Sequence, residues 1–348
     1  MKLFRSLLVA PAALGLMSPF SVSASEVNLS EISNYSDVES MELASFFSNE
    51  ESNNKTLLAG GEGLVDDHSH DGGFSETTTA SFSTDFVLGF NDDDDAGVDT
   101  DDAVQAGYSF QIDLNTSFTG EDSLDISLDA GTQGPGNVND LLDLNSAGDG
   151  LTVDGVKYTF PVGDKTTAFF GIDSDGNSLF TSGCVYGGPS DMLDDCGNVN
   201  AGITGGGVAV GAGYDFGNGL TAAFGAQTTE ASVFTQESQD AYALNLAYTA
   251  DKYGIALTYS DVEQAGLTDE DQFTALNAYY TPEGGFPSIS VGYEFGDIGG
   301  AAADADEQAS FFVGLTWDEV GPGSAGIAAG HSNTNENADE LYQYEAYY

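Results

Sequence analysis

Strict alternation between apolar and polar residues dominates the chain after residue 73. In the clearest run, from Val104 to Phe118, one face carries Val, Ala, Tyr, Phe, Ile and Leu while the other carries Gln, Ser, Asp and Asn. A period of two places successive side chains on opposite faces of a β-strand. Strands of soluble proteins usually have about five or six residues, whereas a tilted strand that crosses a bilayer needs roughly 9–11. We therefore expect strands long enough to span a membrane.

The same alternation recurs to the end of the chain. Clear segments follow at 123–130, 156–162, 208–216, 242–248, 253–259, 289–295 and 311–317, and weaker ones lie near 82–90, 166–172, 220–226, 273–280, 325–329 and 342–348. Together they predict about fourteen strands, with an error of about two either way. Short turns such as 217–219 and 321–323 alternate with long acidic connections at 91–102, 131–150, 173–207 and 296–307. This asymmetry is typical of outer-membrane barrels.

The fold class that best satisfies these strands is all-β, a transmembrane antiparallel β-barrel with a water-filled lumen. An open sheet of this size would leave two unpaired edges and a large exposed apolar face. In a barrel the edges disappear, lipid covers the apolar face and water fills the polar interior. A soluble β-sandwich also alternates, and a structural surface protein or adhesin remains the alternative without transport.

The first residues predict export from the cell. Lys2 and Arg5 precede an apolar stretch from Leu7 to Met17, and Val22-Ser23-Ala24 provides the small residues of a cleavage site. This pattern is typical of a secretory signal peptide, and the apolar stretch is too short for a spanning helix. We expect a signal peptide at 1–24, a short polar linker at 25–73 and the barrel at 74–348, located in the outer membrane.

The charge balance excludes several classes of function. The chain has 57 acidic residues against six Lys plus Arg, and its formal net charge is −51. Such a chain repels nucleic-acid phosphates, so nucleic-acid binding is not expected. Intrinsic disorder is also disfavoured, because the chain contains 22 Phe and 16 Tyr. Outside the signal peptide the basic residues are Lys55, Lys157, Lys165 and Lys252.

Residues that could carry catalysis or bind a metal are sparse. The only histidines are His68, His70 and His331, and no motif places a nucleophile beside a base, so we expect neither an enzyme nor a cofactor. The acidic stretch at 91–102 and the pair His68 and His70 are more typical of solvated segments than of metal sites, although calcium binding by the acidic loops stays open. In an exported chain, Cys184 and Cys196 predict one disulfide, and two free thiols are the alternative.

The polar faces of the predicted strands supply the candidate pore-lining residues. Their carboxylates would concentrate cations and repel anions, which predicts modest cation selectivity. Lys157 and Lys165 could face the same lumen and create a transverse field, or they could lie at the rim and only balance charge. The candidates are Asp85, Gln111, Asp113, Asn115, Asp125, Asp129, Lys157, Lys165, Asp215, Asn245 and Glu294.

Several phrases of the sequence resemble a known family. They are the opening MKLFRSLLVAPAALGLM, then GGFSETTTASFS, SFTGEDSLDISLDAG, DGVKYTFPVGDKTT, SLFTSGCVYGGPSDMLDDCGN, NAYYTPEGGFPSISVGYEFGD and FFVGLTWDEVGPGSAG. With these phrases the chain resembles cyanobacterial outer-membrane porins of the carbohydrate-selective (OprB-like) type. The resemblance implies passive diffusion of small hydrophilic solutes, either sugars or inorganic ions including iron, and porins are often homotrimers.

The sequence departs from that family at two places. Residues 25–72 are too short for the surface-layer-homology domain that usually follows the signal peptide, which puts peptidoglycan anchoring in doubt. The family's chains tend to end in Phe after further strands, whereas this one ends on the alternation Tyr342, Tyr344, Ala346, Tyr348. That ending could serve as an assembly signal or mark a C-terminal truncation.

Overall fold

The computed structural model describes residues 78–89, 104–132, 138–142, 144–145, 148–190, 193, 195–229, 233, 239–263, 270–299, 307–333 and 341–348. The expected signal peptide and linker, the acidic stretch 91–102, and His68 and His70 lie outside these residues. Among the described residues, no helix is both long and apolar enough to cross a membrane.

Fourteen strands of the described residues form one sheet, and their order in the sheet is their order in the chain. Neighbouring strands pair antiparallel, so the expected all-β fold class and strand number are confirmed. One short helix, α2 (Val138–Leu141), lies between β3 and β4. The strands are β1 Thr78–Gly89, β2 Gln105–Thr116, β3 Ser123–Gly131, β4 Gly148–Pro161, β5 Thr166–Ile172, β6 Val208–Gly217, β7 Leu220–Thr228, β8 Asp240–Thr249, β9 Tyr253–Glu263, β10 Glu270–Tyr280, β11 Ser288–Asp297, β12 Glu307–Val320, β13 Gly323–Asn333 and β14 Leu341–Tyr347.

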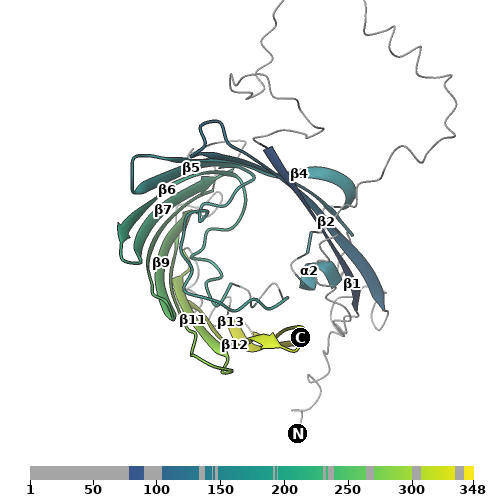
Figure 1. The fold of residues 1–348 in the computed structure, drawn as a ribbon. Helices are drawn as coiled ribbons and strands as arrows, with labels where there is room; N and C mark the ends of the chain where they lie inside the picture. The colour runs from purple at the N-terminus through teal and green to yellow at the C-terminus, as the bar shows by residue number, and fades with distance from the viewer. Residues whose placement is uncertain are drawn as a thin grey trace, which may run out of the picture. The chain divides into compact units, whose positions relative to one another are not determined.

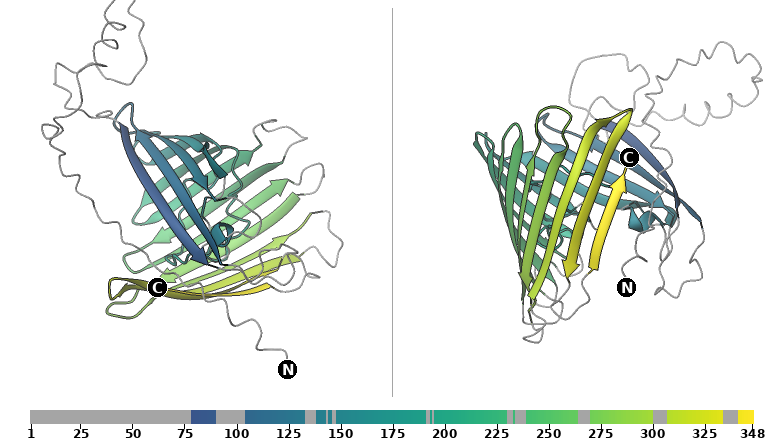
Figure 2. Two further views of the ribbon diagram at one scale, coloured as in Figure 1. Left: turned by 90° about the vertical axis from the view of Figure 1, so that its right-hand side faces the viewer. Right: turned by 90° about the horizontal axis from the view of Figure 1, so that it is seen from below.

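The sheet curls round on itself, so that its C-terminal strands come back towards β1 (Figures 1 and 2). Among the described strand pairs, β1 is bonded to β2 and β14 to β13, and no pair joins β1 to β14. The strand number is even, so β1 and β14 run antiparallel, as closure of an antiparallel barrel requires.

The outward face of the sheet is apolar and uncovered. Along β9, Ile255 and Leu257 are each 44% exposed, while the alternate residues Ala256 and Thr258 are each 1% exposed. Phe86 on β1 is 83% exposed. Exposed apolar rows of this extent destabilise a protein in water, and lipid is the solvent that suits them.

Aromatic side chains gather near the short turns of the sheet. Ring centroids lie 6.1 Å apart between Phe118 and Tyr158, and 6.0 Å apart between Tyr248 and Tyr253. Aromatic rings prefer the level of the lipid headgroups, because they present both an apolar body and a polar or polarisable edge. Aromatic residues at the short-turn end are therefore suited to a membrane interface.

The turn between β2 and β3 is organised by one carboxylate. Asp122 Oδ1 accepts hydrogen bonds from the backbone amides of Phe118 and Thr119 at 3.0 and 2.7 Å and from the Ser117 hydroxyl at 2.7 Å. The Tyr158 hydroxyl on β4 donates to Asp122 Oδ2 at 2.7 Å. These donors hold the pKa of Asp122 below its usual range, with the Tyr158 hydroxyl making the largest contribution.

Replacing Asp122 by Asn should lower the temperature at which the barrel unfolds by several degrees, because the amide removes the charge that strengthens these bonds. A depressed folded pKa stabilises the protein above the unfolded pKa of about 3.9, and this contribution is lost as the pH falls through the folded pKa. The difference between wild type and Asp122→Asn should therefore be present at neutral pH and shrink in strong acid. Heat-modifiable migration on gels measures the unfolding temperature of each protein, at neutral and at acidic pH. Asp164→Asn, in the turn between β4 and β5, is the matched control, and an equal loss in that variant would contradict the assignment.

Candidate functional site

The inward face of β1 to β4 is polar. Residues paired in register share a face, and the pairs here include Asp85 with Ser109, Gln111 with Asp129, and Asn115 with Asp125. Gln111 donates to Asp113 at 2.8 Å, and Asn115 donates to Asp125 at 2.5 Å. Six of the residues expected to line a pore therefore lie together on this wall, namely Asp85, Gln111, Asp113, Asn115, Asp125 and Asp129. Asp129 is only 6% exposed and accepts a hydrogen bond from Thr152 at 2.8 Å.

The two expected lumenal lysines lie at different places. Lys157 is a half-buried residue of β4 in register with Asp125, so it shares the polar wall. Lys165 is exposed in the turn before β5, and its ammonium group lies 3.4 Å from the carbonyl oxygen of Phe216. Asp215 lies beside this turn and accepts from the Gly217 amide at 2.7 Å. Lys165 and Asp215 thus belong to the short-turn end, and Lys157 is separated from them along its strand.

The long connection between β5 and β6, residues 173–207, folds into the interior of the sheet (Figure 1). We call it the inner segment. Its backbone amides donate to inward side chains, Gly176 to Gln227 at 2.9 Å and Thr181 to Asn245 at 3.0 Å. Irregular backbone that is buried needs such partners, since it has no ladder of its own. Inward side chains of β7 and β8 therefore hold the first half of the inner segment.

The second half is held by β10 to β12. Glu294 on β11 accepts the backbone amides of Asn200 and Ala201 at 2.9 and 2.8 Å, and the Asn200 side chain at 2.8 Å. Glu294 is 1% exposed and Asn245 is 5% exposed. Both residues face inward, as the alternation indicates, but the inner segment covers them, so they act as its anchors instead of touching the passage.

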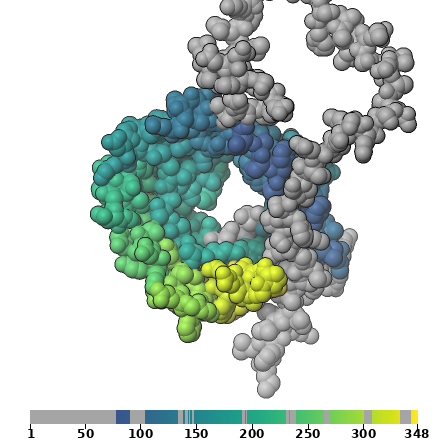
Figure 3. Space-filling model, viewed as in Figure 1, coloured from purple at the N-terminus to yellow at the C-terminus, as the bar shows by residue number. Residues whose placement is uncertain are grey.

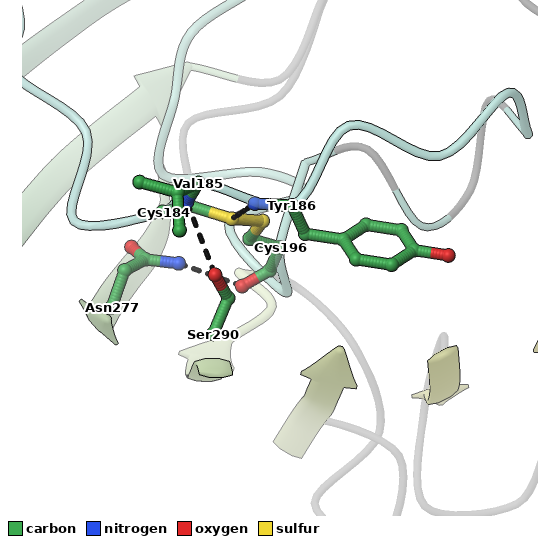
Figure 4. Close-up of a disulfide and its surroundings, with 6 residues drawn as sticks. All are labelled: Cys184, Val185, Tyr186, Cys196, Asn277 and Ser290. Atoms are coloured by element: carbon green, nitrogen blue, oxygen red, sulfur yellow. Dashed lines mark hydrogen bonds between the residues drawn. A yellow bond between two sulfur atoms is a disulfide. The ribbon is translucent and has the colours of Figure 1, made fainter. Parts of the chain in front are cut away.

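A disulfide joins Cys184 to Cys196 in the middle of the inner segment, with Cα atoms 6.3 Å apart. Figure 4 shows the wall bonded on both sides of it: the Val185 amide donates to Ser290 at 3.1 Å, and Asn277 donates to the Cys196 carbonyl at 2.6 Å. The cross-link therefore closes residues 184–196 into a small loop. It lowers the conformational entropy that the inner segment would gain if it detached from the wall.

Tyr186 connects the inner segment to the C-terminal strand. Its ring centroid lies 5.2 Å from that of Phe312, and its hydroxyl donates to the Glu345 carboxylate on β14. Burial and this carboxylate both raise the pKa of Tyr186, so the hydroxyl stays protonated and keeps donating. The inner segment is thus attached to the wall from β7 to β14.

Glycines in the wall allow the inner segment to approach this closely. A Cβ atom at Gly225 would overlap the carbonyl oxygen of Gly176, and one at Gly292 would overlap the carbonyl oxygen of Cys196. Inward glycines within strands are a sequence signal for close approach of another backbone. These glycines mark where the segment packs, which the alternation of apolar and polar residues does not indicate.

An open passage remains inside the ring of strands (Figure 3). The inner segment occupies the side of β7 to β14, and the polar wall of β1 to β4 lies across from it. Among the described residues, no cluster of His, Cys, Asp and Glu is arranged to hold a metal ion. The inner segment therefore narrows the passage without closing it (Figure 3).

Comparisons with protein-family models and with curated proteins find no match. Solved structures do resemble the chain. A mutant of the Rh. blastica porin aligns at 13% sequence identity with a TM-score of 0.51, over 78% of this chain and 89% of that one. A structure described as "Asymmetric conductivity of engineered proteins" aligns at 13% identity with a TM-score of 0.51, over 77% and 89%. At this identity the likeness establishes the fold, which is that of the porin β-barrel.

Gly292→Ala should loosen the inner segment, because the added methyl group collides with the Cys196 carbonyl oxygen. Overpacking costs about 1–3 kcal/mol, so the population with a released segment should rise about fivefold or more. Chymotrypsin cleavage between β5 and β6, mapped by mass spectrometry on folded protein, measures this release. Gly285→Ala, at a position with open space around it, is the control. Equal cleavage rates in wild type and Gly292→Ala would contradict the packing described here.

Proposed function

We propose that the protein is an outer-membrane porin for passive diffusion of small hydrophilic solutes. The observation that carries the proposal is the inner segment, which is anchored by hydrogen bonds to inward side chains and narrows a passage that the barrel would otherwise leave wide. The diameter of a barrel grows with its strand number, and a barrel of fourteen strands is too wide for inward side chains alone to fill it, so water occupies the rest. Narrowing a wet lumen by a fixed segment makes a size filter, and needs no cofactor and no catalytic group.

The charge of the wall supports mild cation selectivity. Asp85 is exposed and Asp113 and Asp125 are half-buried on the polar wall of β1 to β4, where the basic side chain is Lys157. A lumen lined mainly by one sign of charge raises the local concentration of counter-ions. The family resemblance suggests two classes of solute, sugars and inorganic ions including iron. Members of both classes are small enough to pass a filter of this kind.

Other parts of the proposal follow from the same architecture. The exposed apolar faces of the strands suit outer-membrane lipid, and a homotrimer would cover part of them with copies of the same chain. We further propose that residues 1–24 direct export as a signal peptide. Peptidoglycan anchoring through residues 25–73 stays doubtful on sequence grounds, and we propose no enzymatic activity.

Purified protein in liposomes should admit small sugars, and in planar bilayers it should give a reversal potential of cation-selective sign in a salt gradient. A folded barrel without permeability would favour the structural or adhesive alternative. An anion-selective reversal potential would overturn the electrostatic part alone.

The triple substitution of Asp85, Asp113 and Asp125 by Asn should reduce the cation-to-anion permeability ratio by at least about twofold, because it removes fixed negative charge from the wall. Asp251→Asn, in the short turn between β8 and β9, is the control for a carboxylate outside the strands. The reduction should shrink in high salt, where the Debye length falls to about 3 Å at 1 M. An unchanged ratio at low salt would show that these carboxylates do not face the ion path.

A further inference from the structure

A second stretch of chain enters the lumen, on the other wall. It belongs to the connection between β3 and β4, contains α2, and lies inside the ring beside β1 and β2 (Figure 1). The Val138 amide donates to Gln105 at 3.1 Å, and the Asn139 side chain donates to the Tyr108 carbonyl at 2.8 Å. Gln105 is an inward residue at the start of β2, in register with Gly89.

This stretch is built into the wall and is not a loop resting on the surface. Val138 is 4% exposed and Asn139 is 0% exposed, although they sit in a helix of four residues. A Cβ atom at Gly107 would overlap the Asn139 side chain, and one at Gly89 would lie 3.3 Å from Val138. The strands thus provide two glycines where the helix approaches.

The return of the chain is attached as well. Asn139 donates a second hydrogen bond to the Asn145 carbonyl at 3.1 Å, and the Asn145 side chain donates to Gln111 at 3.4 Å. A Cβ atom at Gly131 would overlap that same Asn145 carbonyl oxygen. One buried amide, that of Asn139, therefore ties the helix both to β2 and to the chain that leaves it.

We propose that Val138–Leu142, with Leu144 and Asn145, form a second constriction element, so that the solute path is bounded by a fixed segment on each of two walls. Asn139 is the positioning residue of this element. The inference rests on the proposed porin function and adds a determinant of the size limit. The inner segment holds the side of β7 to β14 and the α2 stretch holds the side of β1 and β2, so that neither segment alone sets the width.

This arrangement also separates two roles on the polar wall. Gln111 contacts the α2 stretch through Asn145, whereas Asp125 and Lys157 lie in register with each other farther along the wall, beyond the residues that the stretch touches. The α2 stretch should therefore restrict the size of solutes near the start of β2, while Asp125 and Lys157 stay along the solute path. Removing it should change the size limit more than the charge selectivity.

The test uses single-channel conductance of the full-length protein with neutral polymers of graded size. Asn139→Ala removes both hydrogen bonds of the buried amide, and a second variant replaces residues 138–145 by a short Gly-Ser linker. Both should raise conductance about 1.5-fold or more and admit larger polymers, with little change in the reversal potential. Asn218→Gly is the matched control, since it removes an asparagine side chain in the turn between β6 and β7, where a φ of 58° suits glycine.

The outcomes are distinguishable. A wild-type protein that forms no channel overturns the proposed function itself. A wild-type channel whose conductance and polymer cut-off are shared by the linker variant overturns the second constriction and leaves the porin function standing. Heat-modifiable migration shows that each variant has kept its barrel, and if Asn139→Ala fails to fold, the linker variant alone decides.

Discussion

In the proposed membrane setting the structure depends on one constraint, that every backbone amide and carbonyl within a bilayer must find a partner inside the protein. Fourteen strands in sequential antiparallel order supply these partners wherever one strand lies beside the next, from β1 through to β14. Because the backbone groups bond within the sheet, side chains have only two directions, outward and inward. The proposed function puts lipid on the outer side and water on the inner side. The apolar outward rows of β8 and β9 and the small or polar inward rows between them follow directly from this division.

The same constraint explains how the two lumenal segments are held. Neither the inner segment nor the α2 stretch has a sheet to satisfy its backbone, so inward side chains of the wall do it instead. Amide and carboxylate groups suit the task, because one side chain can serve several partners: Glu294 accepts from two residues, and Asn139 donates to two carbonyls. Polar inward residues therefore serve two purposes, since some bind the segments and others remain along the passage.

Glycines in the wall make room for the segments that the polar side chains hold. Gly225 and Gly292 lie beneath the inner segment, and Gly107 and Gly131 lie beneath the α2 stretch. Without side chains they let the backbone of a segment, or at Gly107 the Asn139 side chain, come close to the wall, so that hydrogen bonds of ordinary length can form. The proposed filter is thus formed by the wall and the segments together, and the Cys184–Cys196 disulfide cross-links the inner segment.

The sequence alone determined the strands, their number, the outward and inward faces, and the contrast between short turns and long connections, because all of these follow from a period of two and from local turn chemistry. It did not determine which inward residues reach the passage. Asn245 and Asp113 have the same pattern in the sequence, yet only Asn245 lies beneath the inner segment. That difference arises from contacts such as Val185 with Ser290, which are 105 residues apart in the chain. Alternation specifies the face of a strand, whereas only the tertiary fold decides what packs on that face.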